Sequence, residues 1–312
     1  MHRRGIHRRS FVPETETFIG SVDNGCFGYF YRDIKNRELF MKNNKKSIWG
    51  RIMDKTSFGG IFLAIIAVGV GMVLKGVSPV NLLNPAALLI IFLGTMAAVC
   101  IAFPLETLKK VPALFKIIFT EQKTEDVKDI IPMFTEWANL TRREGILALE
   151  NHLDEIEDPF LASGLELAVD GQTPEFIRDV LLEKIDAIEE RHQEGAAIFT
   201  QAGTYAPTLG VLGAVIGLIA ALGNMEDTEA LGHAIAAAFV ATLFGIFSGY
   251  VLWHPFANKL KEKSKKELHA KRVMIEGILS LTTGDSSQVI KGKLSSYLSP
   301  KEYAEFEEGE EQ

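Results

Sequence analysis

The residues that could carry acid–base or metal chemistry are scattered along this chain and form no motif. Seven histidines and two cysteines occur among its 312 residues. The histidines include no HExxH pair, and Cys26 and Cys100 make neither a disulfide framework nor a cysteine-based metal site. Because the sequence also lacks a nucleophile motif and a phosphate-binding loop, we expect no enzyme, no cofactor and no metal site.

Titratable side chains are almost absent from four long apolar blocks of the chain. These blocks contain no Asp, Glu, Lys or Arg, and their one histidine, His233, stands at an outer edge where an interfacial residue is the simpler interpretation. Moving ions through lipid requires a titratable group or a hydrated pore, and a charged side chain there costs ~2.5–3.5 kcal/mol on insertion scales. If the chain takes part in ion transport, a partner must therefore supply the carboxylate.

Prolines and hydroxyls are the remaining polar features of these blocks. Pro207 removes one backbone hydrogen bond from its helix, and Pro255 lies just after the fourth block. Each proline could be a static kink or a helix stop, or else a pivot beside an ion path. Thr242, with Thr204 and Thr208, offers a hydroxyl that in an apolar helix usually bonds back to the preceding turn.

The apolar residues themselves are unevenly distributed, although the overall composition is ordinary, with 47% hydrophobic and 23% charged residues. Each block approaches the ~20 residues that a helix needs to cross a bilayer, so we predict four spans. A soluble helical bundle is the competing interpretation, but buried helices seldom run so long without a charge on any face. The predicted spans are Phe58–Leu74, Pro85–Phe103, Ala196–Leu222 and Leu231–Trp253.

Short links join the spans in pairs, which predicts an all-α integral membrane protein with four transmembrane helices in two hairpins and a large helical cytoplasmic loop. The predicted domains are a first hairpin at 53–103, a cytoplasmic loop at 104–195, a second hairpin at 196–253 and a C-terminal part at 254–312. In the loop, helical spacing of apolar residues predicts helices over Val127–Leu153 and Pro174–Glu194, the second leading almost directly into the third span.

Basic residues near the span ends set the predicted orientation. They lie at the span ends that lead to the termini and the large loop, whereas the short links between paired spans hold only Lys75. Both termini and the loop of this multi-pass protein are therefore expected in the cytoplasm. The C-terminal part begins with a basic helix that can touch anionic lipid and ends in an acidic tail expected to be mobile. The basic residues are Lys45, Lys46, Arg51, Lys55, Lys109, Lys110, Lys116, Lys259, Lys261, Lys263, Lys265 and Lys266.

Residues 1–52 differ from the rest of the chain, being basic, aromatic and without clear periodicity. They lack the apolar core and cleavage site of a signal peptide. We interpret them as a non-native or translated upstream extension and Met53 as the natural start, which the mass of the native protein would test.

Small residues in the last two spans indicate close helix packing. Gly213 and Gly217, like Gly245 and Gly249, have the GxxxG spacing that lets helices approach closely in lipid. Packing within one subunit and packing between subunits both remain open. The net charge of −7 and isoelectric point near 5.6 argue against a nucleic-acid partner.

Four stretches of the sequence carry a family resemblance. They are LTRREGILALE at 140–150, AVDGQTPEFIRD at 168–179, TQAGTYAPTLGVLGAVIGLIAALG at 200–223 and AFVATLFGIF at 238–247, with Pro255 following after seven more residues. Together they resemble the flagellar stator family of MotA proteins, within the MotA/TolQ/ExbB group of ion-driven membrane energisers. The resemblance runs from Met53 almost to the end of the chain.

The resemblance implies a pentameric ring of such chains around the spans of MotB-type, single-span, peptidoglycan-binding partners, whose aspartate carries the ion. It implies that Arg142 and Glu150 contact the rotor protein FliG, with Arg143 beside the arginine position leaving open which arginine dominates. It further implies that Pro207 and Pro255 couple ion flow to torque and that Thr242 faces the channel. Protons are the expected ion, because sodium-driven relatives tend to have threonine where this chain has Ala214.

Two other functions compete with a flagellar stator. An energiser of the ExbB/TolQ kind predicts three spans, whereas this sequence predicts four. A self-contained channel or transporter would need its own polar path or broken-helix site, and the spans contain neither.

Overall fold

A computed structural model of the chain describes residues 54–77, 82, 84–121, 126–223 and 228–310. Segment 1–52 lies outside the described residues, so its interpretation as an extension stays a prediction. The described residues form helices, four of which are long and apolar enough to cross a membrane. These four coincide with the predicted spans, and the predicted all-α fold is confirmed.

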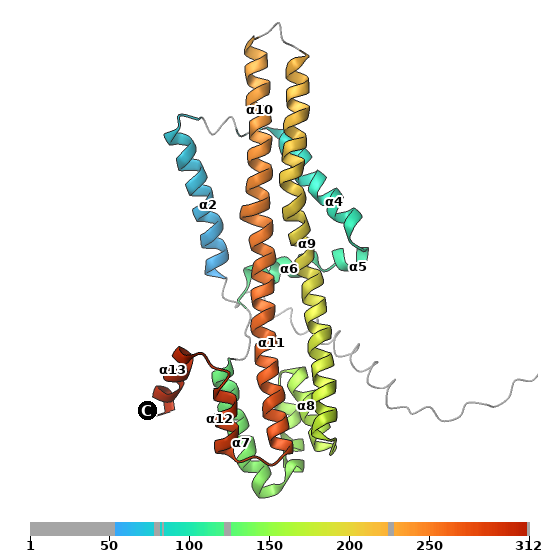
Figure 1. Ribbon diagram of the computed structural model, residues 1–312, viewed down its shortest axis with the longest axis vertical. Helices are drawn as coiled ribbons and strands as arrows, with labels where there is room; N and C mark the ends of the chain where they lie inside the picture. Colours follow the sequence, from blue (N-terminus) through green and yellow to red (C-terminus); the bar gives the residue numbers. More distant parts are fainter. Residues whose placement is uncertain (1–53, 78–81, 83, 122–125, 224–227, 311–312) are drawn as a thin grey trace, which may run out of the picture. The chain divides into compact units, whose positions relative to one another are not determined.

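The first two spans run in opposite directions on different sides of the later helices (Figure 1). The first is α2 (Lys55–Leu74), which Asp54 caps by accepting hydrogen bonds from the next turn's backbone. The second is made of α3 (Pro85–Leu88), the π-helical turn η3 (Leu89–Leu93) and α4 (Gly94–Ala102). Helix α2 packs on α6 and η5, whereas α4 packs on α9.

The described residues of the loop after the second span form five helices. In order they are α5 (Leu105–Leu108), α6 (Val111–Phe119), α7 (Val127–Glu144), the 3₁₀ helix η4 (Ile146–Glu155) and α8 (Pro159–Val169). The prediction of one helix over Val127–Leu153 is wrong, because α7 ends at Gly145. That glycine has φ +86°, a backbone conformation that a helix cannot contain and that glycine adopts easily.

Two very long helices join the apolar part of the molecule to its charged part. Helix α9 (Pro174–Leu222) is continuous over 49 residues, which confirms that the helix predicted over Pro174–Glu194 leads directly into the third span. The fourth span is α10 (Thr228–Phe247), which passes through the π-helical η5 (Ser248–Trp253) into α11 (His254–Thr282). Antiparallel packing of α9 against α10 and α11 is the main contact of the fold.

Two short helices, α12 (Ser287–Ser295) and α13 (Pro300–Glu310), follow α11. The acidic end was expected to be mobile, but most of it is helical. Phe306 is buried at 8% exposure, and Lys128 of α7 bonds to Glu305 at 2.5 Å. An apolar anchor and an ion pair with α7 thus hold this acidic helix in place.

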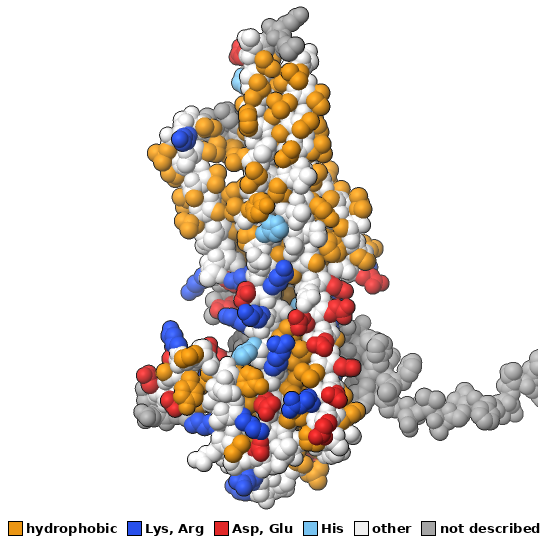
Figure 2. Space-filling view, viewed as in Figure 1, with side chains coloured by type: hydrophobic (Ala, Val, Ile, Leu, Met, Phe, Trp, Pro, Cys, Tyr) orange, Lys and Arg blue, Asp and Glu red, His pale blue; other side chains and the backbone are white. Residues whose placement is uncertain are grey.

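The described part divides into an apolar and a charged region. Hydrophobic side chains cover α2, α4, α10 and the later half of α9, whereas charged side chains gather over α7, α8, α11 and the earlier half of α9 (Figure 2). The charged region has its own core, whose most buried members include Phe134, Leu165, Ile177, Leu181 and Ile278. This division agrees with a membrane part and a folded part outside it.

Candidate ion-pathway and rotor-contact sites

Helices α9 and α10 touch backbone to backbone at a pair of glycines. A Cβ atom on Gly245 would lie 2.7 Å from Cα of Gly210 and 2.8 Å from the carbonyl oxygen of Ala206. A Cβ atom on Gly210 would lie 2.9 Å from the carbonyl oxygen of Ala241. Such distances leave no room for a side chain, so these small residues pack the two helices within one chain.

The two GxxxG spacings belong to this same contact. Gly213 and Gly217 face the Cβ atoms of Ala241 and Ala238, where added Cβ atoms would stand 3.3 Å away in each case. The sequence left open whether these glycines pack within one subunit or between subunits. In the structure they pack within the subunit.

Pro207 lies inside α9 without interrupting it. Because proline has no N–H, the carbonyl of Gly203 loses its usual donor four residues later. Gly249 of η5 lies against both groups, since its Cβ would stand 2.7 Å from Cγ of Pro207 and 2.8 Å from the Gly203 oxygen. The missing hydrogen bond of α9 at Pro207 thus lies against the π-helical turns of η5. We call these two places the irregular points of the helices.

Pro255 does not end its helix, so the interpretation as a helix stop is wrong. It stands in the first turn of α11, directly after the π-helical turns of η5. A proline ring clashes with the carbonyl four residues earlier in a regular helix, and the wider π turn gives that carbonyl space. The ring of His254 lies on Gly203, whose Cβ would meet it at 2.8 Å. Pro255 and Pro207 are therefore joined through one contact region.

The threonine hydroxyls bond back to their own helices, as expected. Thr242 donates to the carbonyl of Ala238 at 3.4 Å, and Thr204 and Thr208 each donate to the carbonyl four residues earlier at 3.1 Å. A hydroxyl that donates in this way keeps its acceptor lone pairs for another group. Thr242 is half-buried and Thr204 and Thr208 are exposed on α9.

The predicted rotor-contact charges stand at the far end of the charged region. Arg142 and Arg143 are exposed in the last turn of α7, and Glu150 is exposed on η4. Among the described residues none of the three forms an ion pair. A cleft of about 900 Å³ is lined by both arginines, with Trp137 and His152 among its other walls, but not by Glu150.

The structure thus separates the residues predicted from the sequence into two groups. Pro207, Thr242 and Pro255 belong to the region where α9 packs on α10, η5 and the start of α11, and Arg142 and Glu150 belong to the α7–η4 tip. No sequence motif singles out His152, which lines the arginine cleft and whose Nδ1 lies 3.6 Å from the Glu155 carboxylate. The break at Gly145, which turns η4 back beside α7, was the signal that could have placed it there.

Sequence comparison finds relatives along most of the chain. Residues 152–272 match the profile of the MotA/TolQ/ExbB proton channel family. The chain is 62% identical to "Motility protein A" of Bacillus subtilis (strain 168), over 83% of this chain and 97% of that protein.

Structural comparison finds two similar solved structures. One is the flagellar MotAB stator complex from Bacillus subtilis, with a TM-score of 0.78 and 62% identity, covering 81% of this chain and 99% of the matched chain. The other is MotAB of C. jejuni, with a TM-score of 0.76 and 30% identity, covering 80% of this chain and 97% of the matched chain.

Proposed function

We propose how two sites of this chain, which belongs to the MotA family of motility proteins, convert proton flow into torque. The chain is a flagellar stator subunit, a multi-pass membrane protein that forms the proton channel of a MotAB complex. Its MotB-type partner belongs to the same oligomeric complex. The torque that this complex delivers to the rotor is the function that we assign to the chain's two sites.

The missing membrane carboxylate is the observation that carries this proposal. The apolar stretches of the four spans, Phe58–Leu74, Pro85–Phe103, Ala196–Leu222 and Leu231–Trp253, contain no Asp, Glu, Lys or Arg. A channel subunit without its own titratable group needs one from a partner. We therefore assign the ion-carrying aspartate to the single span of the peptidoglycan-binding MotB-type subunit, and the proton path to the surface between the two proteins.

Coupling belongs to the region of Pro207, Thr242 and Pro255. Helices α9 and α10–α11 are continuous from the membrane into the cytoplasmic core, and their two irregular points touch. A weakened hydrogen-bond ladder at that contact is the natural place for a small bend. In our proposal, proton passage beside Thr242 changes this bend, and α9 and α11 carry the change to the α7–η4 tip.

The α7–η4 tip is our assigned rotor contact. Arg142, Arg143 and Glu150 are exposed, and no described residue neutralises them. Charges of both signs on neighbouring elements favour a fast, orientation-dependent encounter with an oppositely patterned partner surface. The rotor protein FliG is the partner that we assign to this tip.

We assign the assembly to a pentameric ring in the bacterial inner membrane, with both termini and the α5–α8 loop in the cytoplasm. The lysines that follow the second and fourth spans support this orientation. Ala214, in place of a coordinating hydroxyl, supports protons over sodium as the ion.

Deletion of the gene tests the proposal. We expect cells that still build flagella but do not rotate them, with rotation restored by a plasmid copy of the chain. The adjacent gene should encode a one-span protein with a membrane aspartate and a peptidoglycan-binding domain. Normal swimming in the deletion strain, with no second stator set in its genome, would refute the assignment.

A further inference from the structure

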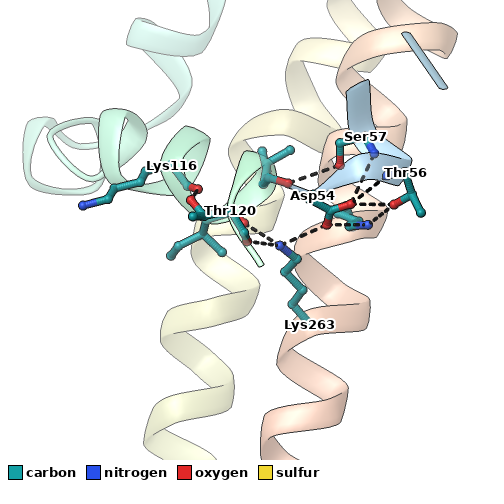
Figure 3. Close-up of polar contacts among 9 residues, drawn as sticks. Asp54, Thr56, Ser57, Lys116, Thr120 and Lys263 are labelled. Carbon is teal, nitrogen blue, oxygen red and sulfur yellow. Dashed lines mark hydrogen bonds and ion pairs between the residues drawn. The ribbon is translucent and has the colours of Figure 1, made fainter. Parts of the chain in front are cut away.

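Three elements meet at a polar cluster that the proposed sites do not include. The cluster consists of Asp54 and Thr56 at the start of α2, the last carbonyls of α6, and Lys259 and Lys263 of α11 (Figure 3). The side chains of Asp54 and Lys263 are only 10% and 14% exposed. Charges so well covered need partners, and the cluster supplies them.

The end of α6 is capped largely from other elements. The last carbonyls of a helix lack intrahelical donors. Here the Lys263 ammonium donates to the carbonyls of Ile117 at 2.6 Å and Thr120 at 2.7 Å. The backbone N–H of Asp54 donates to the carbonyl of Phe119 at 3.1 Å, and the Ser57 hydroxyl donates to the carbonyl of Ile118 at 3.2 Å. Four successive carbonyls at the end of α6, from Ile117 to its C-cap Thr120, are thus bound by α11 and by the start of α2 with its N-cap.

The two oxygens of Asp54 act on different helices. Oδ1 accepts the backbone N–H groups of Thr56 and Ser57, which caps α2. Oδ2 lies 2.8 Å from the Lys259 ammonium and 3.4 Å from that of Lys263. Burial by itself would raise the pKa of Asp54, but the bonds from Lys259, Thr56 and Ser57 outweigh burial and hold the pKa well below its usual range. The carboxylate therefore stays charged throughout the physiological range of pH.

This cluster is the principal attachment of α2 within the described chain. Near it, Phe58 packs on Phe119 with ring centroids 5.0 Å apart, and Ile61 touches the aromatic cluster around Phe199. Farther along, no described residue of α2 is buried, and Leu74 at its end is 82% exposed. The first span is therefore held chiefly at its cytoplasmic end, and most of its remaining residues are exposed.

We propose that Lys263 is a positioning residue for torque transmission, which ties α11 to the ends of α2 and α6 just beyond Pro255. The inference rests on the proposed stator function and deepens it. Lys263 follows Pro255 by two turns, so it braces α11 on the cytoplasmic side of the assigned pivot. With the Lys263 contacts in place, bending at η5 displaces α11 together with α6 and α2. Without these contacts, α11 moves alone and the cytoplasmic core receives less of the displacement.

The test measures ion flux and torque separately in cells that lack the chromosomal gene and carry plasmid copies of the chain and its partner. Lys263→Met removes the ammonium but keeps most of the apolar stem. Asp54→Asn removes the ion pairs but keeps the cap, because Asn caps a helix about as well as Asp. Lys263→Arg should restore function, since a guanidinium can still bind carbonyls and a carboxylate. Lys266→Met, at an exposed position of the same helix, is the matched control.

We expect Lys263→Met and Asp54→Asn to lower stall torque by about threefold or more, a typical size for a coupling residue. Cytoplasmic acidification on induction and the amount of protein in the membrane should stay near those of the parent chain. Unchanged torque would overturn the inference, as would torque that falls in proportion to flux. The inference would also be overturned if neither variant accumulated in the membrane, because the cluster would then serve folding. If the unmodified chain itself fails to restore rotation, the proposed function fails instead.

Discussion

At the scale of single residues, the α7–η4 tip carries exposed charges that no described residue pairs. A contrast is Lys271 of α11, whose ammonium lies 3.3 Å from the Asp158 carboxylate and over the ring of Phe160. Arg142 and Glu150 have no such partner among the described residues, and both are exposed. Folding does not need these two charges, so their effect should appear in contact with another protein.

Reversing one of these charges should reduce torque and leave the protein in the membrane. A single exposed pair contributes ~0.2–1 kcal/mol, so we expect Arg142→Glu and Glu150→Lys each to lower torque by a few-fold, and more strongly at low ionic strength. Tethered-cell rotation measures the torque. Arg143→Glu tells which arginine dominates, and Glu308→Lys, an exposed charge of α13, is the control. Full torque in both Arg142→Glu and Glu150→Lys would remove these residues from the rotor contact.

His192 predicts an acid-sensitive contact between α9 and α11. Its Nδ1 lies 2.8 Å from the Ser264 hydroxyl, and burial lowers its pKa, although Glu267 acts in the opposite direction and Arg191 and Lys271 add to the lowering. The folded chain therefore prefers the neutral ring. As pH falls below the ordinary histidine pKa of about 6.5, the unfolded chain binds more protons, and folding stability decreases.

We expect the thermal midpoint of the purified protein to fall between pH about 7.5 and about 5.5, values on either side of the ordinary histidine pKa. The fall should be smaller in His192→Gln, which keeps a side chain able to bond to Ser264 and cannot titrate. His269→Gln changes an exposed ring and is the control. An equal acid shift in the parent chain and in His192→Gln would show that His192 does not cause it.

At the scale of elements, the backbone contact of α9 with α10 sets the strictest requirement. Gly245→Ala places a methyl group 2.7 Å from Cα of Gly210, which must push the helices apart. Overpacking of this kind costs about 1–3 kcal/mol, so we expect a lower thermal midpoint and a loss of rotation. Gly69→Ala in α2 should be tolerated, because a Cβ atom added at Gly69 has no neighbouring atom within 4 Å. A Gly245→Ala protein with normal stability and rotation would contradict this packing.

Long elements with a single strong pattern were predictable, whereas local exceptions were not. Four uncharged blocks led to the four spans, and helical spacing after Pro174 led to α9. The break at Gly145 depends on a positive φ, which a glycine permits without requiring. The π turns of η5 arise from packing of Gly249 on Pro207 and from the ring of Pro255, contacts that no periodicity reveals. The Asp54–Lys263 pair joins residues 209 positions apart, for which the sequence shows no local signal.

At the scale of the whole molecule, the chain combines an apolar membrane part and a second part dense in charge. Two continuous helices connect the parts, so a change at the contact of α9 and η5 has a direct route to the α7–η4 tip. In our proposal the chain shapes the proton path, and the partner carries the proton.

Replacing the membrane aspartate of the MotB-type partner by asparagine tests that division. The apolar stretches of this chain's four spans hold no carboxylate that could substitute, so we expect both cytoplasmic acidification and rotation to disappear. Asparagine matches aspartate in size, and an uncharged side chain is easier to bury in lipid, so the two proteins should still co-purify. A glutamate at the same position is the control and should keep measurable flux, because it restores a titratable carboxyl. Proton flux that persists with asparagine in the partner would mean that this chain conducts by its own groups, and the assignment of the carrier to the partner would be wrong.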